Sequence, residues 1–473
     1  MKTTRLLSFV LILCVPILLS GQGHVQAADK SSLTAGLARV VITPEAPIWM
    51  AGYASRNHPS EGKVHDLYAK ALAVQDGGGR RLVLVTSDLI GFPRSIADSI
   101  AQRVERRFGL KRNELLLTST HTHTGPVLAD SLTGSYSLDA EQTLAVEKYT
   151  AQLQDKIVGV VGEALTALAP ARLSFGRGAA QFAVNRREPT PTGVKLGVNR
   201  SGPVDPQVPV LRIDAEDGTL RGVLFGYACH NTTLPGEFYQ LCGDYSGFAQ
   251  AALETSHPGA VALFVMGCGA DANPFPRGSL ADAEANGDEL ARSVEAVLAG
   301  SIKPIQGPLI LPYARFNIPL AKAPSREQFQ ARLSDKDRFV RLHAERMIAS
   351  LDRDGKLPTH YPYTAQVVRF GGDLTLVALA GEVVVDYALR LQRELGAERL
   401  WVVAYANDVP AYIPTARMLE EGGYEPDRSM IYYGLPGPFS PEVEEIIIRR
   451  VRRMVGSRQR AVGSRQGTTQ GHR

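Results

Sequence analysis

The stretch LVLVTSDLIGFPRSIADSIAQRVERRFGLKRNELLLTSTHTH, residues 82–123, holds the pattern that decides the fold. Leu82–Thr86 and Glu114–Thr120 are short runs rich in aliphatic and β-branched residues, as expected for buried strands. Between them, Ile96–Phe108 has helical periodicity with its charged residues on one face. A strand, a helix and a second strand in this order favour an α/β fold.

The alternation of strands and helices continues on both sides of this stretch. Lys70–Gln75 precedes Leu82–Thr86 across Asp76-Gly77-Gly78-Gly79, and two more hairpins are expected around Glu216-Asp217-Gly218 and Gly371-Gly372. The sequence therefore predicts an α/β protein with a mixed β-sheet core, flanking helices and several hairpins. The other predicted strands are Val208–Ile213, Leu220–Ala228, Val261–Met266, Thr364–Phe370, Leu374–Leu379 and Leu400–Tyr405, and the other predicted helices are Glu141–Leu168, Phe248–Glu254, Leu280–Leu298, Arg326–Leu351, Val384–Leu395 and Glu442–Met454.

The first 27 residues have the pattern of a cleaved signal peptide. Lys2 and Arg5 form a basic start, Leu6–Leu19 is apolar, and Val25-Gln26-Ala27 offers small residues for cleavage. A membrane anchor is the alternative, but a spanning helix needs about 20 apolar residues and this run contains Pro16. We expect export, to the periplasm or outside the cell.

Charge is distributed unevenly along the chain. The formal net charge is +4, but without the two basic residues of the signal and the eight arginines of residues 449–473 the remainder carries −6. A mildly acidic body argues against a nucleic-acid partner. Residues 455–473 are expected to be a basic, disordered tail with at most weak contact to a membrane surface.

Cysteine usage does not indicate a disulfide scaffold. Outside the signal the chain has Cys229, Cys242 and Cys268. A bridge between Cys229 and Cys242 stays open, because spacing alone does not establish disulfide geometry.

Polar side chains follow most of the predicted strands. In α/β sheets ligands bind beyond the strand ends, so we expect an active site where these side chains converge. Polar residues also mark strand ends generally, and this alternative explains Asp88 well but His121-Thr122-His123 poorly. The residues concerned are Asp88, His121, His123, Cys229, His230, Asp271, Glu382, Asn407, Asp408 and Tyr412.

The His121-Thr122-His123 triplet is the most specific of these signals. Residues two apart on an extended chain point to the same side, so both imidazoles can face one site. A catalytic zinc takes about three protein ligands and keeps an open position. His230 and Glu382 could complete such a set, although single histidines are also commonly structural.

These motifs resemble those of the neutral/alkaline non-lysosomal ceramidase family of zinc amidases over about residues 35–430. The loop Gly267–Pro274 follows the family only loosely, and Val383-Val384 replaces its usual aromatic and threonine. The blocks that carry the resemblance are Gly36-Leu37-Ala38, Ile42-Thr43-Pro44, Met50–Ala54, His65–Ala71, Thr120–Pro126, Asn185-Arg186, Cys229-His230, Gly243–Gly247, Gly381-Glu382, and Tyr412 with Tyr424 twelve residues later.

The resemblance implies the roles of the site residues. Zinc would be held by four ligands, His121, His230, Glu382 and Tyr412. His123 would lie beside the zinc-bound water as a proton acceptor, while Arg186 and Tyr424 would contact the substrate. Asp244 and Asp271 are candidates to orient the histidines from behind, with loop capping as the equal alternative.

Residues 28–454 would then form one zinc hydrolase domain, without the C-terminal β-sandwich of larger members. The implied reaction is hydrolysis of an N-acyl amide, in ceramide or a related lipid, by zinc-activated water. Two alternatives stay open: a zinc hydrolase of the same scaffold acting on another amide or ester, and a metal-binding protein without turnover.

Overall fold

The computed structural model describes residues 33–132, 134–136 and 138–456. The predicted signal peptide, residues 1–27, lies outside this range, as does the predicted tail from residue 457 onward. Residues 455 and 456, which we assigned to the tail, instead end the last helix, α10 (Val443–Gly456).

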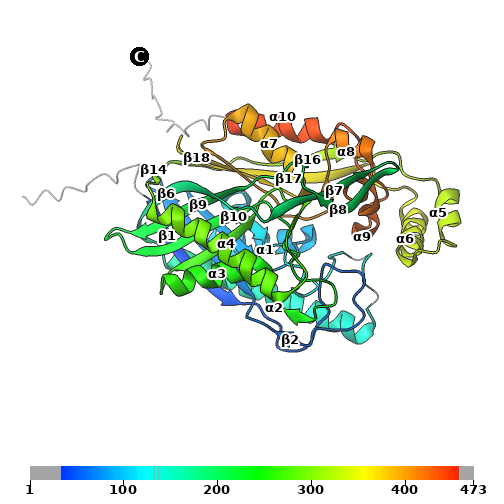
Figure 1. Cartoon of the computed structure of the whole chain (residues 1–473), viewed down its shortest axis with the longest axis horizontal. Helices are drawn as coiled ribbons and strands as arrows, with labels where there is room; N and C mark the ends of the chain where they lie inside the picture. Colours follow the sequence, from blue (N-terminus) through cyan, green and yellow to red (C-terminus); the bar gives the residue numbers. More distant parts are fainter. Residues whose placement is uncertain (1–32, 133, 137, 457–473) are drawn as a thin grey trace, which may run out of the picture.

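Two β-sheets face each other, and helices cover both outer sides (Figure 1). Helices α7 and α10 lie over the smaller sheet, and α1–α4 lie over the larger one. This layered arrangement confirms the predicted α/β class. These helices span Arg94–Phe108 (α1), Ala140–Thr166 (α2), Asp244–Ser256 (α3), Leu280–Ala299 (α4), Val385–Leu395 (α7) and Val443–Gly456 (α10).

The larger sheet has the order β12-β10-β9-β6-β1-β3-β4-β5, with β14 paired to β6. Most of its strands pair antiparallel, but β4 with β5 and β10 with β12 are parallel, which makes the sheet mixed. Its strands are β1 (Leu33–Val41), β3 (Tyr68–Asp76), β4 (Arg81–Ser87), β5 (Leu115–Ser119), β6 (Ala169–Ala179), β9 (Gln207–Ala215), β10 (Leu220–Tyr227), β12 (Val261–Met266) and β14 (Lys303–Ile305).

The smaller sheet has the order β15-β17-β18-β20, with β16 paired to β17. A third sheet, β13-β7-β8, lies beside the ends of these two and carries part of the site described below. The strands are β7 (Ala183–Thr190), β8 (Gly193–Asn199), β13 (Ala272–Pro274), β15 (Leu309–Ile310), β16 (Tyr313–Pro319), β17 (His360–Phe370), β18 (Leu374–Leu379) and β20 (Leu400–Val403), and two short pairs are β2 (Gly62–Lys63) with β11 (Gln240–Leu241) and β19 (Glu382–Val383) with β21 (Tyr412–Ile413).

The continuous apolar runs of β4 and β5 reflect burial on both faces of the sheet. Leu84 and Leu116 pack between the two sheets, together with residues of β18 and β20. Val85 and Leu117 point the opposite way and pack against α1 and α2. Strands that are buried on both sides need apolar residues at every position, which is why strict alternation is missing from the sequence.

The predicted hairpins are confirmed. In the first of them, Asp76 ends β3 and its Oδ1 accepts the backbone N–H groups of Gly78 and Arg80, both at 2.9 Å. β3 then pairs antiparallel with β4 in the register Gln75↔Arg81. An aspartate that bonds the backbone of the following residues is a common way to close such a turn.

The predicted helix Arg326–Leu351 is wrong as a single element. The structure has two helices, α5 (Arg326–Arg332) and α6 (Arg338–Asp354). Asp337 starts the second helix because its side chain accepts the Phe339 N–H at 2.9 Å. Helical periodicity is present on both sides of this short break, so the sequence pattern alone did not reveal Asp337 as an N-cap.

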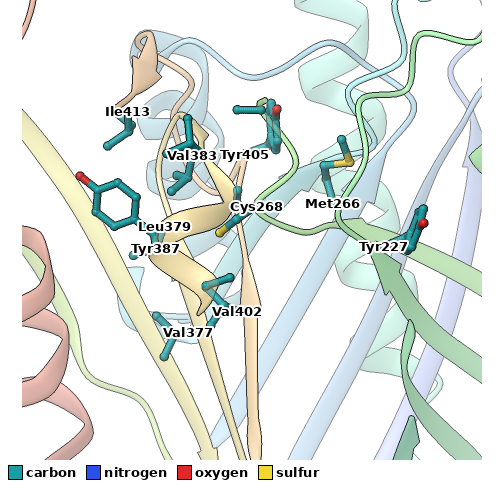
Figure 2. Close-up of a cluster of buried hydrophobic side chains, with 14 of the residues drawn as sticks. Tyr227, Met266, Cys268, Val377, Leu379, Val383, Tyr387, Val402, Tyr405 and Ile413 are labelled. Atoms are coloured by element: carbon teal, nitrogen blue, oxygen red, sulfur yellow. The ribbon is translucent and has the colours of Figure 1, made fainter. Parts of the chain in front are cut away.

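A buried cluster lies where the ends of the two sheets meet (Figure 2). Val377 and Leu379 of β18 and Val402 of β20 gather with Met266 and Cys268 from the end of β12. The same cluster includes the neighbours of two site residues, Val383 beside Glu382 and Ile413 beside Tyr412. This packing holds the backbone that presents those two side chains.

Cys229, Cys242 and Cys268 are buried free thiols, so the bridge left open above is not formed. Among the residues that the structure describes, no helix combines the length and the apolar character that crossing a bilayer requires.

A buried ion pair between β3 and α3 allows a stability test. Lys70 Nζ lies 2.7 Å from Glu254 Oε1 with 3% of the lysine side chain exposed, whereas Arg39 reaches the other oxygen of Glu254 from a half-exposed position. We expect Glu254→Gln to lower the free energy of unfolding by about 3 kcal/mol, because it leaves a buried ammonium without its carboxylate.

Arg39→Gln is the matched control and is expected to cost less than about 1 kcal/mol, since an exposed pair contributes little. Urea unfolding measures both values. If both substitutions lowered the free energy of unfolding equally, the buried Lys70–Glu254 pair would not be the main stabilising interaction of Glu254.

Candidate metal centre

The ends of three strands from two sheets bring four side chains together. His121 follows β5, His230 follows β10, Glu382 follows β18 in β19, and Tyr412 stands in β21. β19 and β21 pair in parallel with Glu382 opposite Tyr412. The expected site at the strand ends is therefore where these residues meet.

Hydrogen bonds between β5 and the chain after β20 join the two sheets at this point. The Asn407 N–H donates to the Leu117 carbonyl at 2.7 Å, and the Leu117 N–H donates to Asn407 Oδ1 at 3.2 Å. Asn407 adopts a positive φ of 65° and His121 one of 59°. Left-handed backbone is unfavourable for such residues and is typical of functional sites, where the surrounding structure holds it in place.

The nitrogen and oxygen atoms that could bind a metal lie within 3.3 Å of their neighbours. His121 Nε2 is 3.2 Å from His230 Nε2 and 3.2 Å from Glu382 Oε2. His230 Nε2 is 3.1 Å from the same carboxylate oxygen and 3.3 Å from the Tyr412 hydroxyl. His123 Nε2 lies 3.1 Å from His121 Nε2. His121, His123 and His230 form a buried group that could hold a metal ion.

The tautomers of two histidines are set by backbone carbonyls. His121 Nδ1–H donates to the Ile90 carbonyl at 2.6 Å, and His230 Nδ1–H donates to the Gly269 carbonyl at 3.1 Å. Because a carbonyl can only accept, each neutral ring must carry its lone pair on Nε2. Two such lone pairs and the Glu382 carboxylate then face one point.

This arrangement fits a metal ion. Lone pairs that converge without a proton between them repel each other unless a cation lies among them. Ligand atoms bonded to one tetrahedral zinc at 2.0–2.1 Å are about 3.3 Å apart, which is close to the 3.1–3.3 Å separations seen here. Imidazole, carboxylate and phenol are also donor types that zinc accepts in proteins.

Burial and neighbouring charges keep these groups in the form that binds a cation. Burial and Arg186 lower the pKa of His230 to about 4, and burial with His121 lowers that of His123 well below its usual value. Burial alone would raise the pKa of Glu382, but the adjacent histidines outweigh it and hold that pKa well below the ordinary range. His123 and His230 are thus neutral at neutral pH, and Glu382 favours its charged form.

Two tyrosines hold Glu382, and the sequence indicated neither of them. The Tyr433 hydroxyl donates to Glu382 Oε1, and the Tyr405 hydroxyl donates to Oε2 at 3.4 Å. Gly381, with φ of 86°, lies so close to β21 that a Cβ there would be 2.7 Å from Ile413. Nothing in the spacing of Tyr405 or Tyr433 distinguishes them from packed aromatic residues.

Arg186 and Tyr424 lie on the same side of the site. The Arg186 guanidinium lies 5.4 Å from the Tyr412 ring centroid and 5.7 Å from that of Tyr424. Its Nε donates to Glu425 Oε1 at 2.8 Å, and Arg187 binds the other oxygen of Glu425 at 2.7 Å. Glu425, also missed from sequence, fixes the π-helical turn Tyr424–Arg428 against β7.

Asp244 and Asp271 do not orient the histidines, whose second ring nitrogens are held by carbonyls. Asp244 accepts the backbone N–H groups of Leu234 at 2.9 Å and Tyr245 at 2.6 Å. Asp271 accepts the N–H of Val385 at 2.8 Å, at the start of α7. The loop-capping alternative describes both, because buried backbone donors need acceptors where loops leave the sheets.

A pocket of about 280 Å³ adjoins the candidate metal ligands. His123, Arg186, Glu382, Tyr412 and Tyr424 line it, whereas His121 and His230 lie behind these residues and are not part of the lining. Its other lining residues are Gly52, Tyr53, Ala54, Ile90, Leu132, Ser135, Leu196, Thr232, Asn273, Arg277, Tyr432 and Tyr433.

Comparison with known proteins gives related sequences that match about half of the chain. The protein is 29% identical over 250 residues to neutral ceramidase of Pseudomonas aeruginosa, covering 51% of this chain and 36% of that protein. It is 28% identical over 243 residues to neutral ceramidase of Mycobacterium tuberculosis, covering 48% and 37%. The matched segment thus spans just over a third of each relative.

Solved structures resemble nearly the whole chain. The crystal structure of neutral ceramidase from Pseudomonas aeruginosa superposes with a TM-score of 0.70 and 20% identity, covering 90% of this chain and 74% of that one. A ceramidase complexed with C2 superposes with a TM-score of 0.68 and 19% identity, covering 89% and 74%. These likenesses confirm the fold.

One family model, the N-terminal part of neutral/alkaline non-lysosomal ceramidase, matches residues 34–279, just over half of the 473-residue chain. That segment includes the motifs around His121, His123, Arg186 and His230, on which the resemblance first rested. The chain therefore belongs to the neutral/alkaline non-lysosomal ceramidase family.

Proposed function

We propose that this protein is an exported, zinc-dependent amidohydrolase that cleaves an N-acyl amide bond, in ceramide or a related N-acyl lipid. The observation that carries the proposal is the convergence of two imidazole lone pairs, a carboxylate and a phenol beside one pocket, which Glu382 and Tyr412 line. The relatives named neutral ceramidases support the reaction class.

His121, His230, Glu382 and Tyr412 would hold the zinc. When bound there, zinc would act as a Lewis acid and lower the pKa of water from ~15.7 to around 7. Hydrolysis adds water across the amide, breaks the C–N bond and yields a carboxylic acid and an amine.

His123 would receive the proton that water loses. Its ring is neutral, because burial and His121 lower its pKa, and its Nε2 faces the metal-binding atoms. The Tyr53 ring packs against it at a centroid distance of 5.0 Å. Gly52 leaves no room behind it, since a Cβ there would be 2.4 Å from His123 Nδ1. The ring therefore stays oriented toward the site, as a general base requires.

Tyr424 would bind the oxygen that gains charge, and Arg186 would bind that oxygen or another oxygen of the substrate. Burial raises the pKa of Tyr424 well above its ordinary value, so its hydroxyl keeps a proton to donate. Tyr412 and Glu425 outweigh the burial of Arg186 and raise its pKa, so it stays charged. Preorganised donors of this kind are worth roughly 3 kcal/mol each in a water-poor site.

The direct test is hydrolysis of a panel of N-acyl lipids, simple amides and esters by the purified mature protein, with metal content measured alongside. We expect turnover of N-acyl amides with about one zinc per chain. Absence of turnover with zinc fully bound would contradict the hydrolase proposal and favour a metal-binding protein.

His123 separates two possible ligand sets. As a proton acceptor it should be dispensable for zinc, so we expect His123→Gln to keep stoichiometric zinc while kcat falls by about 10²–10⁴-fold. Metal analysis of the folded variant checks this, with wild type as reference. Loss of zinc would instead make His123 a ligand, in place of or beside Tyr412.

A further inference from the structure

The pocket above the metal centre has two chemically different sides. Ile90, Leu132 and Tyr432 contribute an apolar and aromatic side. The other side consists of hydrogen-bonding and cationic groups from β7, β13 and the loops after β10 and β13, namely Arg186, Thr232, Asn273 and Arg277, which we call the cationic corner.

Arg186 is the buried residue of the cationic corner, and one nitrogen of its guanidinium group lacks a hydrogen-bond partner among the described residues. Only 6% of the residue is exposed. Its Nε binds Glu425 and its Nη1 reaches Asn273 Oδ1 at 3.5 Å, but its buried Nη2 has no hydrogen-bond partner in the described part of the chain. A buried charged donor without an acceptor is costly, so this atom marks a position for an acceptor from a ligand.

Arg277 adds a second positive charge at the mouth. It interacts with the Tyr53 hydroxyl and, more weakly, with Asp244. The Asp244 carboxylate is already taken by the backbone N–H groups of Leu234 and Tyr245. Among the described residues that line the pocket, Glu382 is the one carboxylate, and it faces the histidines. The charge of Arg186 is paired with Glu425, whereas Arg277 makes no salt bridge among the described residues, so the cationic corner offers the Arg277 charge and the unpaired Arg186 Nη2 to a ligand.

The position of the cationic corner relates this charge to the reacting bond. Arg186 lies 5.4 Å from the ring of Tyr412, which belongs to the metal-binding group. A group bound by Arg186 must therefore sit within a few bonds of the amide that is cleaved.

We propose that the cationic corner binds a carboxylate on the amine side of the substrate, so that the preferred substrate is an N-acyl amino acid rather than a neutral N-acyl amide. The proposal rests on the amidohydrolase function above and specifies its substrate class. Arginine binds carboxylates through paired, charge-assisted hydrogen bonds, and the apolar side of the pocket accommodates the start of the acyl chain.

The test uses two substrates that differ in one group. N-lauroylglycine and N-lauroylethanolamine share the acyl chain and the amide, but the first ends in a carboxylate and the second in a hydroxymethyl group. With zinc-loaded mature protein, we expect kcat/KM for N-lauroylglycine to be about tenfold higher, mainly through KM, because charge-assisted hydrogen bonds form only with the carboxylate.

Arg277→Gln should lower the ratio of the two kcat/KM values by about fivefold, as expected for one partly exposed charge. High salt should lower the ratio as well. Arg200→Gln makes the same charge change at an exposed arginine that packs on Phe275, outside the pocket lining, and should leave the ratio unchanged.

Equal turnover of the two amides, or faster turnover of the neutral one, would overturn the proposal, as would an unchanged ratio in Arg277→Gln. If neither lauroyl amide nor ceramide is hydrolysed, the amidohydrolase function fails instead. In that case calorimetric binding of N-lauroylglycine against N-lauroylethanolamine still decides the role of the cationic corner, and equal affinities would refute it.

Discussion

Alanine in place of His230 is expected to release the metal and abolish turnover. The ring contributes one of the converging lone pairs, and its Nδ1–H is fixed by the Gly269 carbonyl, so no neighbouring group can replace it. Loss of partners that only support a ligand already costs 10- to 100-fold in metal affinity. We therefore expect zinc binding by His230→Ala to weaken by more than about 100-fold, and the same for His121→Ala.

Zinc content after dialysis against a weak chelator measures this effect. His257→Ala is the matched control, because that histidine pairs with Glu295 at 3.0 Å on the surface and should retain metal and activity. Circular dichroism verifies that each variant is folded. Stoichiometric zinc in the double variant His121→Ala/His230→Ala would remove both residues from the site.

Replacing Tyr412 by phenylalanine and replacing Tyr424, twelve residues later, by phenylalanine are expected to impair different properties of the protein. The Tyr412 hydroxyl lies 3.3 Å from His230 Nε2 and belongs to the proposed ligand set, so Tyr412→Phe should weaken zinc binding and recover partly in excess zinc. Tyr424 lines the pocket with a protonated hydroxyl, so Tyr424→Phe should keep full zinc while kcat falls by roughly 100-fold, the scale for one oxyanion donor.

Zinc content and kcat measured on both variants separate these outcomes. Tyr239→Phe is a suitable control, since its hydroxyl bonds Asn57 at the surface. If both pocket variants turned over substrate like wild type, their rings would be packing residues and the proposed mechanism would lose its oxyanion donor.

The local sequence pattern predicted the strands that carry the site residues better than it predicted the strands that pair with them. The β-rich runs before His121, His230 and Glu382 are strands, because long stretches of buried aliphatic residues have few alternatives in a layered fold. β6 and β1, in the middle of the larger sheet, escaped prediction. Both are interrupted by glycine, alanine and charged residues whose compatibility with a strand depends on neighbours that the local sequence does not specify.

The residues of the candidate site also differ in how far the local sequence could predict them. His121 and His123 do face one site, as their spacing predicted, but the backbone at His121 is left-handed with φ of 59°, so the alternation of an extended chain is not what brings the two rings together. Arg186, Tyr412 and Tyr424 were identified by family resemblance, with no periodicity to support them. For Asp244 and Asp271 the sequence left two alternatives, and the structure has the loop-capping one: the histidines are held by the Ile90 and Gly269 carbonyls, and backbone acceptors leave no mark in a sequence.

By itself, then, the sequence determined the α/β class and the strands that end at the site, since hydrophobic pattern is local, and it marked His121 and His123 as a pair after β5. Only the tertiary structure decided that Tyr433 and Tyr405 hold Glu382, that Glu425 anchors Arg186, and that Arg277 faces the pocket. Glu425 and Arg186 are 239 residues apart. Such contacts exist only after two sheets have packed and brought their strand ends together, so no short-range rule along the chain can specify them.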